Sequence, residues 1–404
     1  MKRTLALGGV AAGLLATALV SQPASAVSDV ASDPLATSGI AAYNVAAFWL
    51  GNQAENLIGA TPYNVETKVA AKHVSTGGPA ADSKPGVVPA IGDEKKSTST
   101  SKNVNLPKTT GKVFFTVPDG SDEGSKPDPR WCTATSLQST YRNLVATAGH
   151  CVYDTETNSA TLDQWVFVPG YYQGKLPWGL YVGKQAFTHY DYDVYEDGDR
   201  DYAFVTVYNG LKYVPRPGET GTPYVPSVTP TDWKEVTPEI YNSTNIWQGF
   251  KKKDGDKYYF RKFTDAGRLG DNVGGQGLAY NQKLGKNVFV FGYPSGSHPD
   301  GNYAFSGKTL KWSYGKTFAA TAAARKAEEL QGVKSSFTGQ GSLGSAWLLQ
   351  YKNTRRLGYL NGVTSAVSDT DGNLRIDTSV SPYFDGELYG IYSAAKNMWS
   401  GSIA

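Results

Sequence analysis

The stretch NLVATAGHC, residues Asn143–Cys151, decides the fold prediction. Its apolar beginning predicts a strand, which runs into small residues and then presents an imidazole beside a cysteine. Cys132 is the only other cysteine in the chain. In an exported protein, a disulfide between Cys132 and Cys151 is the default expectation. Such a bridge would fix the backbone beside His150, as a general base requires.

The composition is typical of a β-rich exported protein with many turns. The 404 residues include 45 Gly and 26 Tyr, and 19% of them are charged, which is below the usual quarter. Lys and Arg number 39 against 36 Asp and Glu, so the formal net charge is +3. This balance gives no electrostatic support for nucleic-acid binding. The length allows one large domain or two modest ones.

The first residues read as an export signal. A basic start at residues 1–3 is followed by an apolar run over 5–20 and by the small-residue site Ala24-Ser25-Ala26. These features predict a signal peptide over 1–26 and an extracellular mature chain that starts near Val27, with no membrane contact after cleavage. The alternative, a membrane anchor, is disfavoured because the apolar core is too short to span comfortably.

The mature chain changes character near residue 110. Residues 27–110 are rich in Ala, Ser, Thr, Lys and Gly, with a polar run over 93–102, and fit a pro-segment or a flexible linker equally well. Residues 111–404 predict one β-rich domain with extra chain inserted at about 209–271. We expect helices over 317–330 and near 388–398. Strands are expected at 113–117, 143–147, 164–168, 202–207, 287–291, 346–349 and 357–363.

A family resemblance rests on three stretches. WCTAT (131–135), ATAGHC (146–151) and WVFVPGYY (165–172) resemble the catalytic-histidine element of the chymotrypsin-fold serine proteases, and most closely the secreted bacterial, glutamyl-endopeptidase-like branch. The resemblance covers roughly 111–397. It implies an all-β fold of two six-stranded antiparallel barrels with a C-terminal helix, with His150 as general base. It further implies a monomer that acts on a protein or peptide substrate and needs no metal or cofactor.

The acid that orients the histidine is predicted to be Asp201. A histidine base needs a carboxylate to hold its tautomer. DYAFV (201–205) places one Asp directly before an apolar strand and resembles the family's acid motif. The other acidic residues of the preceding loop open no strand and are interpreted as solvated charges; they are Asp191, Asp193, Asp197 and Asp199.

The nucleophile stretch departs from the family pattern. TGQGSLGSAW (338–347) is one residue longer than the motif that it resembles. Alignment from its start places Ser342 on the nucleophile, with the backbone N–H groups of Gln340 and Ser342 as the oxyanion hole. Alignment from its end places Leu343 there, which could not act, and Ser345 fits neither alignment. Leu343 or a neighbour is the insertion in the first case.

Two functions therefore stay open. The first is a secreted serine endopeptidase that hydrolyses peptide bonds with Ser342, His150 and Asp201. The second is a catalytically inactive protease-fold protein that acts by binding. The sequence assigns no substrate specificity, because residues 362–365, where the resemblance places the pocket wall, carry no charge.

Overall fold

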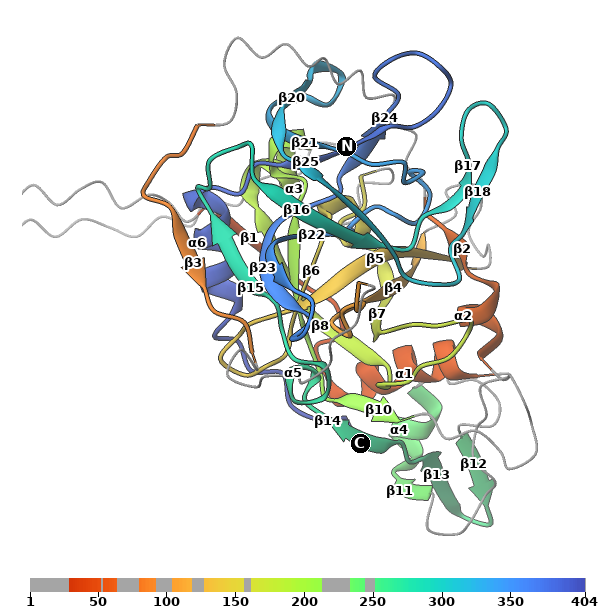
Figure 1. Cartoon of the computed structure of the whole chain (residues 1–404). Helices are drawn as coiled ribbons and strands as arrows, with labels where there is room; N and C mark the ends of the chain where they lie inside the picture. The colour runs from red at the N-terminus through yellow and green to blue at the C-terminus, as the bar shows by residue number, and fades with distance from the viewer. Residues whose placement is uncertain are drawn as a thin grey trace, which may run out of the picture.

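The computed structural model describes residues 29–51, 54–63, 80–91, 104–117, 127–155, 161–212, 233–243 and 251–403. The predicted signal peptide and the polar run at 93–102 lie outside these residues. Strands dominate the described chain, as predicted (Figure 1). Among the helices within these ranges, none is long and apolar enough to cross a membrane.

The first half of the domain is a closed antiparallel barrel. Each strand pairs with the next around the ring, and the last pairs with the first. Val113, Val145 and Val205 are fully buried in its interior. Closure leaves no free sheet edge in the ring. In ring order the strands are β4 (Thr110–Val117), β5 (Asp128–Leu137), β6 (Leu144–Thr147), β9 (Ala203–Val207), β8 (Tyr181–His189) and β7 (Asp163–Pro169).

The second half contains two sheets. A six-stranded sheet has the order β19 (Lys311–Lys316), β16 (Asn287–Gly292), β22 (Ala346–Lys352), β23 (Leu357–Val363), β15 (Gly277–Tyr280) and β3 (Gly86–Val88). A four-stranded sheet has the order β20 (Phe318–Ala322), β21 (Ala327–Lys334), β25 (Thr378–Pro382) and β24 (Ala366–Ser368). The architecture matches the predicted all-β fold, and the first half is a six-stranded antiparallel barrel as predicted.

The helix predicted over 317–330 is wrong. This stretch forms β20, a short 3-10 turn named η5 (Ala323–Arg325), and β21. Its alanines have high helix propensity, but propensity is a weak preference that tertiary pairing overrides. Here β21 pairs with both β20 and β25, and Ala320, Ala322 and Leu330 are buried in the core of the small sheet.

The predicted C-terminal helix is present as α6 (Gly386–Ala395). Asp385 caps it by accepting a hydrogen bond from the Leu388 N–H at 3.0 Å. Leu388, Ile391 and Ala395 share one face at helical spacing and are buried in a cluster with barrel residues. The helix therefore packs on the outside of the barrel (Figure 1).

The described residues 29–63 are folded against the barrel, whereas β3 adds to the six-stranded sheet of the second half. Strand β1 (Val30–Pro34) pairs with β8, and α1 (Gly39–Leu50) follows it. Trp49 of α1 is fully buried, and its Nε1 donates to the backbone oxygen of Gln164 in β7. Next come α2 (Glu55–Gly59) and β2 (Thr61–Pro62), which runs parallel to β5. This packing is what we would expect both of a bound pro-segment and of an integral part of the domain.

The insertion expected at 209–271 carries its own small sheets. β10 (Gly210–Lys212) pairs with β14 (Thr264–Gly267). β11 (Trp233–Val236), β13 (Lys257–Arg261) and β12 (Lys251–Asp254) form a three-stranded sheet beside α4 (Pro238–Ser243). Figure 1 shows this sheet projecting beyond α1, away from the centre of the barrel.

Candidate active site

His150 lies in a short 3-10 turn, η2 (Gly149–Cys151), directly after β6. Cys132 of β5 and Cys151 form a disulfide with a Cα–Cα distance of 6.2 Å, as predicted. Gly149 is required by close approach, because a Cβ there would lie 2.4 Å from the ring of Tyr192. The His150 side chain is 3% exposed. The bridge and this packing hold His150 in one place.

Asp201 meets His150 because their strands pair. The β6–β9 register sets Thr147 opposite Ala203, so the residues that follow β6 and precede β9 lie together. The Nδ1 atom of His150 lies 2.8 Å from Oδ2 and 3.0 Å from Oδ1 of Asp201. The His150 backbone N–H also donates to Oδ1 at 3.0 Å. These bonds fix the orientation of the imidazole and leave Nε2 as the ring nitrogen that is not bonded to Asp201.

Arg325 is a third member of this group, and sequence reasoning missed it. Its Nη2 lies 3.1 Å from Asp201 Oδ2, and its Nη1 donates to the Ser365 backbone oxygen at 2.9 Å. Burial alone raises the pKa of Asp201, but the charges of His150 and Arg325 and the hydrogen bonds from His150 hold it well below its usual range. A helix over 317–330 gave no reason to expect this contact. In the structure the chain turns at η5 instead, and the Arg325 side chain points toward Asp201 of the barrel half.

The interpretation of Asp199 as a solvated charge is wrong. Its side chain is buried and accepts hydrogen bonds from the N–H groups of Glu328 and Glu329, each at 2.8 Å. Burial raises its pKa to about 6. Asp197 instead accepts from the Asp199 N–H at 3.0 Å and so begins the 3-10 turn η3 (Gly198–Arg200). Asp199 therefore anchors β21 to the loop that carries Asp201.

Ser342 is not brought into hydrogen-bond contact with His150. Its Oγ donates to the backbone oxygens of Thr338 at 2.6 Å and of Gly339 at 3.2 Å, and the side chain has no exposed surface. Its backbone N–H, one of the predicted oxyanion donors, also points to the Gly339 oxygen at 3.2 Å. Within the described chain, His150 Nε2 has no hydrogen-bond partner.

The backbone of Leu343, in the same loop, is bonded to the backbone of β5. Its backbone oxygen accepts from the N–H of Thr133, the residue after Cys132, at 2.8 Å. Its side chain is 2% exposed and packs in the same cluster as the disulfide. Ser345, the third candidate, donates through Oγ to the backbone oxygen of Ser342. The Gln340 backbone oxygen accepts from Ser295 N–H at 2.8 Å.

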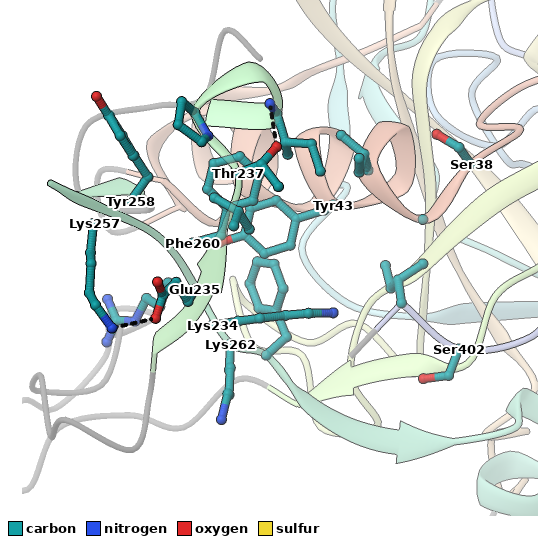
Figure 2. Close-up of a pocket in the computed structure, with 18 of the residues that line it drawn as sticks. Ser38, Tyr43, Lys234, Glu235, Thr237, Lys257, Tyr258, Phe260, Lys262 and Ser402 are labelled. Carbon is teal, nitrogen blue, oxygen red and sulfur yellow. Dashed lines mark hydrogen bonds and ion pairs between the residues drawn. The ribbon is translucent and has the colours of Figure 1, made fainter. Parts of the chain in front are cut away.

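A cavity of about 810 Å³ lies elsewhere, and none of the predicted site residues lines it. It is formed by α1, the three-stranded sheet of the insertion and the chain near Ser402 (Figure 2). The rings of Tyr43 and Phe260 stack in its wall with centroids 5.4 Å apart. Lys234 and Lys262 line the same cavity.

Comparison with known proteins gives matches among solved structures. The chain is similar to protease Anisep from Arthrobacter nicotinovorans (22% identity, TM-score 0.48) and to the thermostable serine protease AL20 from an extremophilic microorganism (20%, 0.47). Each match covers 72% of this chain and 97% of the other. A Glu endopeptidase in complex with MPD matches at 17% identity and TM-score 0.40, over 76% of this chain and 98% of its own. No family model and no curated protein matches the chain.

Proposed function

We propose that the protein is a protease-fold binding protein, which holds a peptide segment beside His150 and does not cleave it with a serine nucleophile. The supporting observation is the placement of the loop at 338–347. A serine nucleophile needs its hydroxyl within about 2.6–3.2 Å of the base. The hydroxyl of Ser342 is instead bonded to Thr338 and Gly339, while the apolar side chain of Leu343 is buried in the cluster that contains the disulfide.

A serine endopeptidase that uses Ser342 is the second candidate. The pairing of His150 with Asp201 favours it, because this pair has the geometry that a general base requires. Catalysis would need the Ser342 hydroxyl to leave both of its carbonyl partners and turn toward Nε2. It would also need the Ser342 N–H to leave the Gly339 oxygen before it could stabilise an oxyanion.

A fluorophosphonate probe separates the two candidates, because it reacts covalently with activated serines. The full-length secreted chain and its Ser342→Ala variant are incubated with the probe, and labelling is followed by mass spectrometry. We expect no labelling of the folded wild-type chain. Labelling that disappears in Ser342→Ala would establish the endopeptidase instead.

Export is part of the proposal. The basic start, the apolar run and the Ala24-Ser25-Ala26 site support a secreted protein whose first residue is near Val27. The N-terminus of the protein recovered from culture medium, determined by mass spectrometry, tests this. It also tells whether α1 and β2 remain attached to the barrel in the mature protein.

A further inference from the structure

The short segment Ala60–Tyr63 is bound to the barrel wall beside the disulfide. Its strand β2 runs parallel to β5, and the Tyr63 N–H donates to the Trp131 backbone oxygen at 2.9 Å. The Trp131 indole Nε1 donates back to the Ala60 oxygen at 3.2 Å. Arg130 Nη1 adds a bond to the Thr61 hydroxyl at 2.9 Å. The segment is therefore held mainly through its backbone.

The opposite wall is the loop that contains Ser342. The Gly341 N–H donates to the Tyr63 oxygen at 3.4 Å, so Tyr63 is bonded to both walls. Gly341 has φ of +70°, and a Cβ there would lie 2.2 Å from the Trp131 ring. Only glycine allows the loop to approach Trp131 this closely. The main chain of Tyr63 therefore lies between β5 and this loop and is bonded to both.

The side chain of Tyr63 lies over the histidine. It is 4% exposed, and its ring centroid lies 6.3 Å from that of the His150 imidazole. The edge of the ring also meets Phe115 of β4, with centroids 5.1 Å apart. Tyr63 packs in the same cluster as Leu343 and the disulfide. This aromatic side chain accounts for part of the burial of His150.

We infer that the surface between Trp131 and the loop at 338–344 is a binding groove for an extended peptide with a tyrosine side chain, and that the chain's own Thr61-Pro62-Tyr63 fills it. The inference deepens the proposed function and rests on it. Backbone hydrogen bonds to a strand give affinity for any extended peptide, and a pocket for one side chain gives selectivity. The groove has both, in β5 and in the Tyr63 pocket.

An external peptide must compete with this internal ligand. A covalently attached segment has an effective concentration of the order of millimolar. The intact chain should therefore bind an added peptide weakly. A chain whose own segment lacks the buried Tyr63 side chain should bind the peptide more tightly. Uncovering the groove should also uncover the imidazole of His150.

Binding is tested with a fluorescent peptide of residues 54–63 and the Tyr63→Ala chain. Ile58→Ala is the matched control, because Ile58 belongs to the same segment but is 46% exposed. We expect the peptide to bind Tyr63→Ala about tenfold or more tightly than it binds wild type or Ile58→Ala. A peptide with Tyr63 replaced by Ala should bind the Tyr63→Ala chain more weakly than the unchanged peptide does. Equal affinities for all three chains would overturn the inference.

A second readout is modification of His150 by diethyl pyrocarbonate, mapped by mass spectrometry. We expect His150 to react faster in Tyr63→Ala than in Ile58→Ala, and an unchanged rate contradicts the groove. For the case in which Tyr63→Ala fails to fold, hydrogen exchange in the wild-type chain replaces both assays. Millimolar peptide should then accelerate exchange at the Tyr63 amide, and no acceleration overturns the inference.

The two proposals fail in different ways. If Tyr63→Ala binds the peptide and hydrolyses it, the groove is real and the absence of serine catalysis is wrong. If the fluorophosphonate probe gives no labelling and Tyr63→Ala binds no peptide, the proposed absence of serine catalysis is upheld and the proposed binding groove is wrong.

Discussion

The Nη2 atom of Arg325 lies 3.1 Å from the same Asp201 oxygen that lies 2.8 Å from His150 Nδ1. Arg325 belongs to the second half of the domain, between β20 and β21, while Asp201 and His150 belong to the barrel. Its other nitrogen binds the backbone of Ser365. The guanidinium therefore joins the two halves at the acid of the site.

Replacing Arg325 should destabilise the protein. In Arg325→Gln the fully buried Asp201 keeps its charge but loses a cationic partner, and removing one partner of a buried ion pair typically costs about 3–5 kcal/mol. Arg325 is itself 15% exposed and His150 remains, so we expect the lower end of this range. Urea unfolding measures it. Arg375→Gln, which removes a pair with Asp300 at the surface, is the control and should cost less than about 1 kcal/mol.

Introducing a hydroxyl at Leu343 should create reactivity toward a fluorophosphonate. Alignment from the end of the loop places Leu343 on the nucleophile, and its side chain packs in the same buried cluster as the disulfide. Leu343→Ser therefore supplies a hydroxyl at that alternative position, while His150 Nε2 has no hydrogen-bond partner in the described chain. Leu343→Ala creates a similar cavity without the hydroxyl and is the matched control. We expect labelling of Leu343→Ser only. If Leu343→Ser folds and remains unlabelled, position 343 does not face the base.

Asp199 should make the protein less stable as the pH rises. Its pKa in the folded protein is raised to about 6, above the value of about 3.9 in an unfolded chain. A raised pKa means that the folded state binds the proton more tightly. The contribution to stability is therefore complete below about pH 4 and is lost as the pH rises through 6. The unfolding free energy, measured between pH 4 and 7, should fall less steeply in Asp199→Asn, and an unchanged slope contradicts the assignment.

Helix α1 should contribute to the stability of the whole domain. Trp49 is fully buried against β7, and truncating a buried aromatic side chain typically costs about 3–5 kcal/mol. We expect Trp49→Ala to lower the unfolding free energy by this amount in the full chain. Ile40→Ala, in the same helix but 39% exposed, should change it by less than 1 kcal/mol. Equal effects would mean that the helix does not pack on the barrel.

Local patterns in the sequence determined the barrel and part of the site. The expected strands at 113–117, 143–147, 164–168 and 202–207 lie within or overlap β4, β6, β7 and β9, since apolar runs bounded by turn residues carry their own signal. The Cys132–Cys151 bridge followed from the presence of only two cysteines. The proximity of Asp201 to His150 was predicted from a residue placed directly before a strand.

Only the tertiary structure decided the contacts that join distant segments. Arg325 lies 124 residues from Asp201 along the chain, and an Ala-rich stretch gives no sign that strand pairing will overrule its helix propensity. The alignment of the loop at 338–347 was ambiguous by one residue. In the structure, the Ser342 hydroxyl is bonded to the Thr338 oxygen, and the Thr133 N–H holds the Leu343 backbone beside β5. Tyr63 reaches His150 because β2 pairs with β5, and such long-range pairing leaves no local pattern.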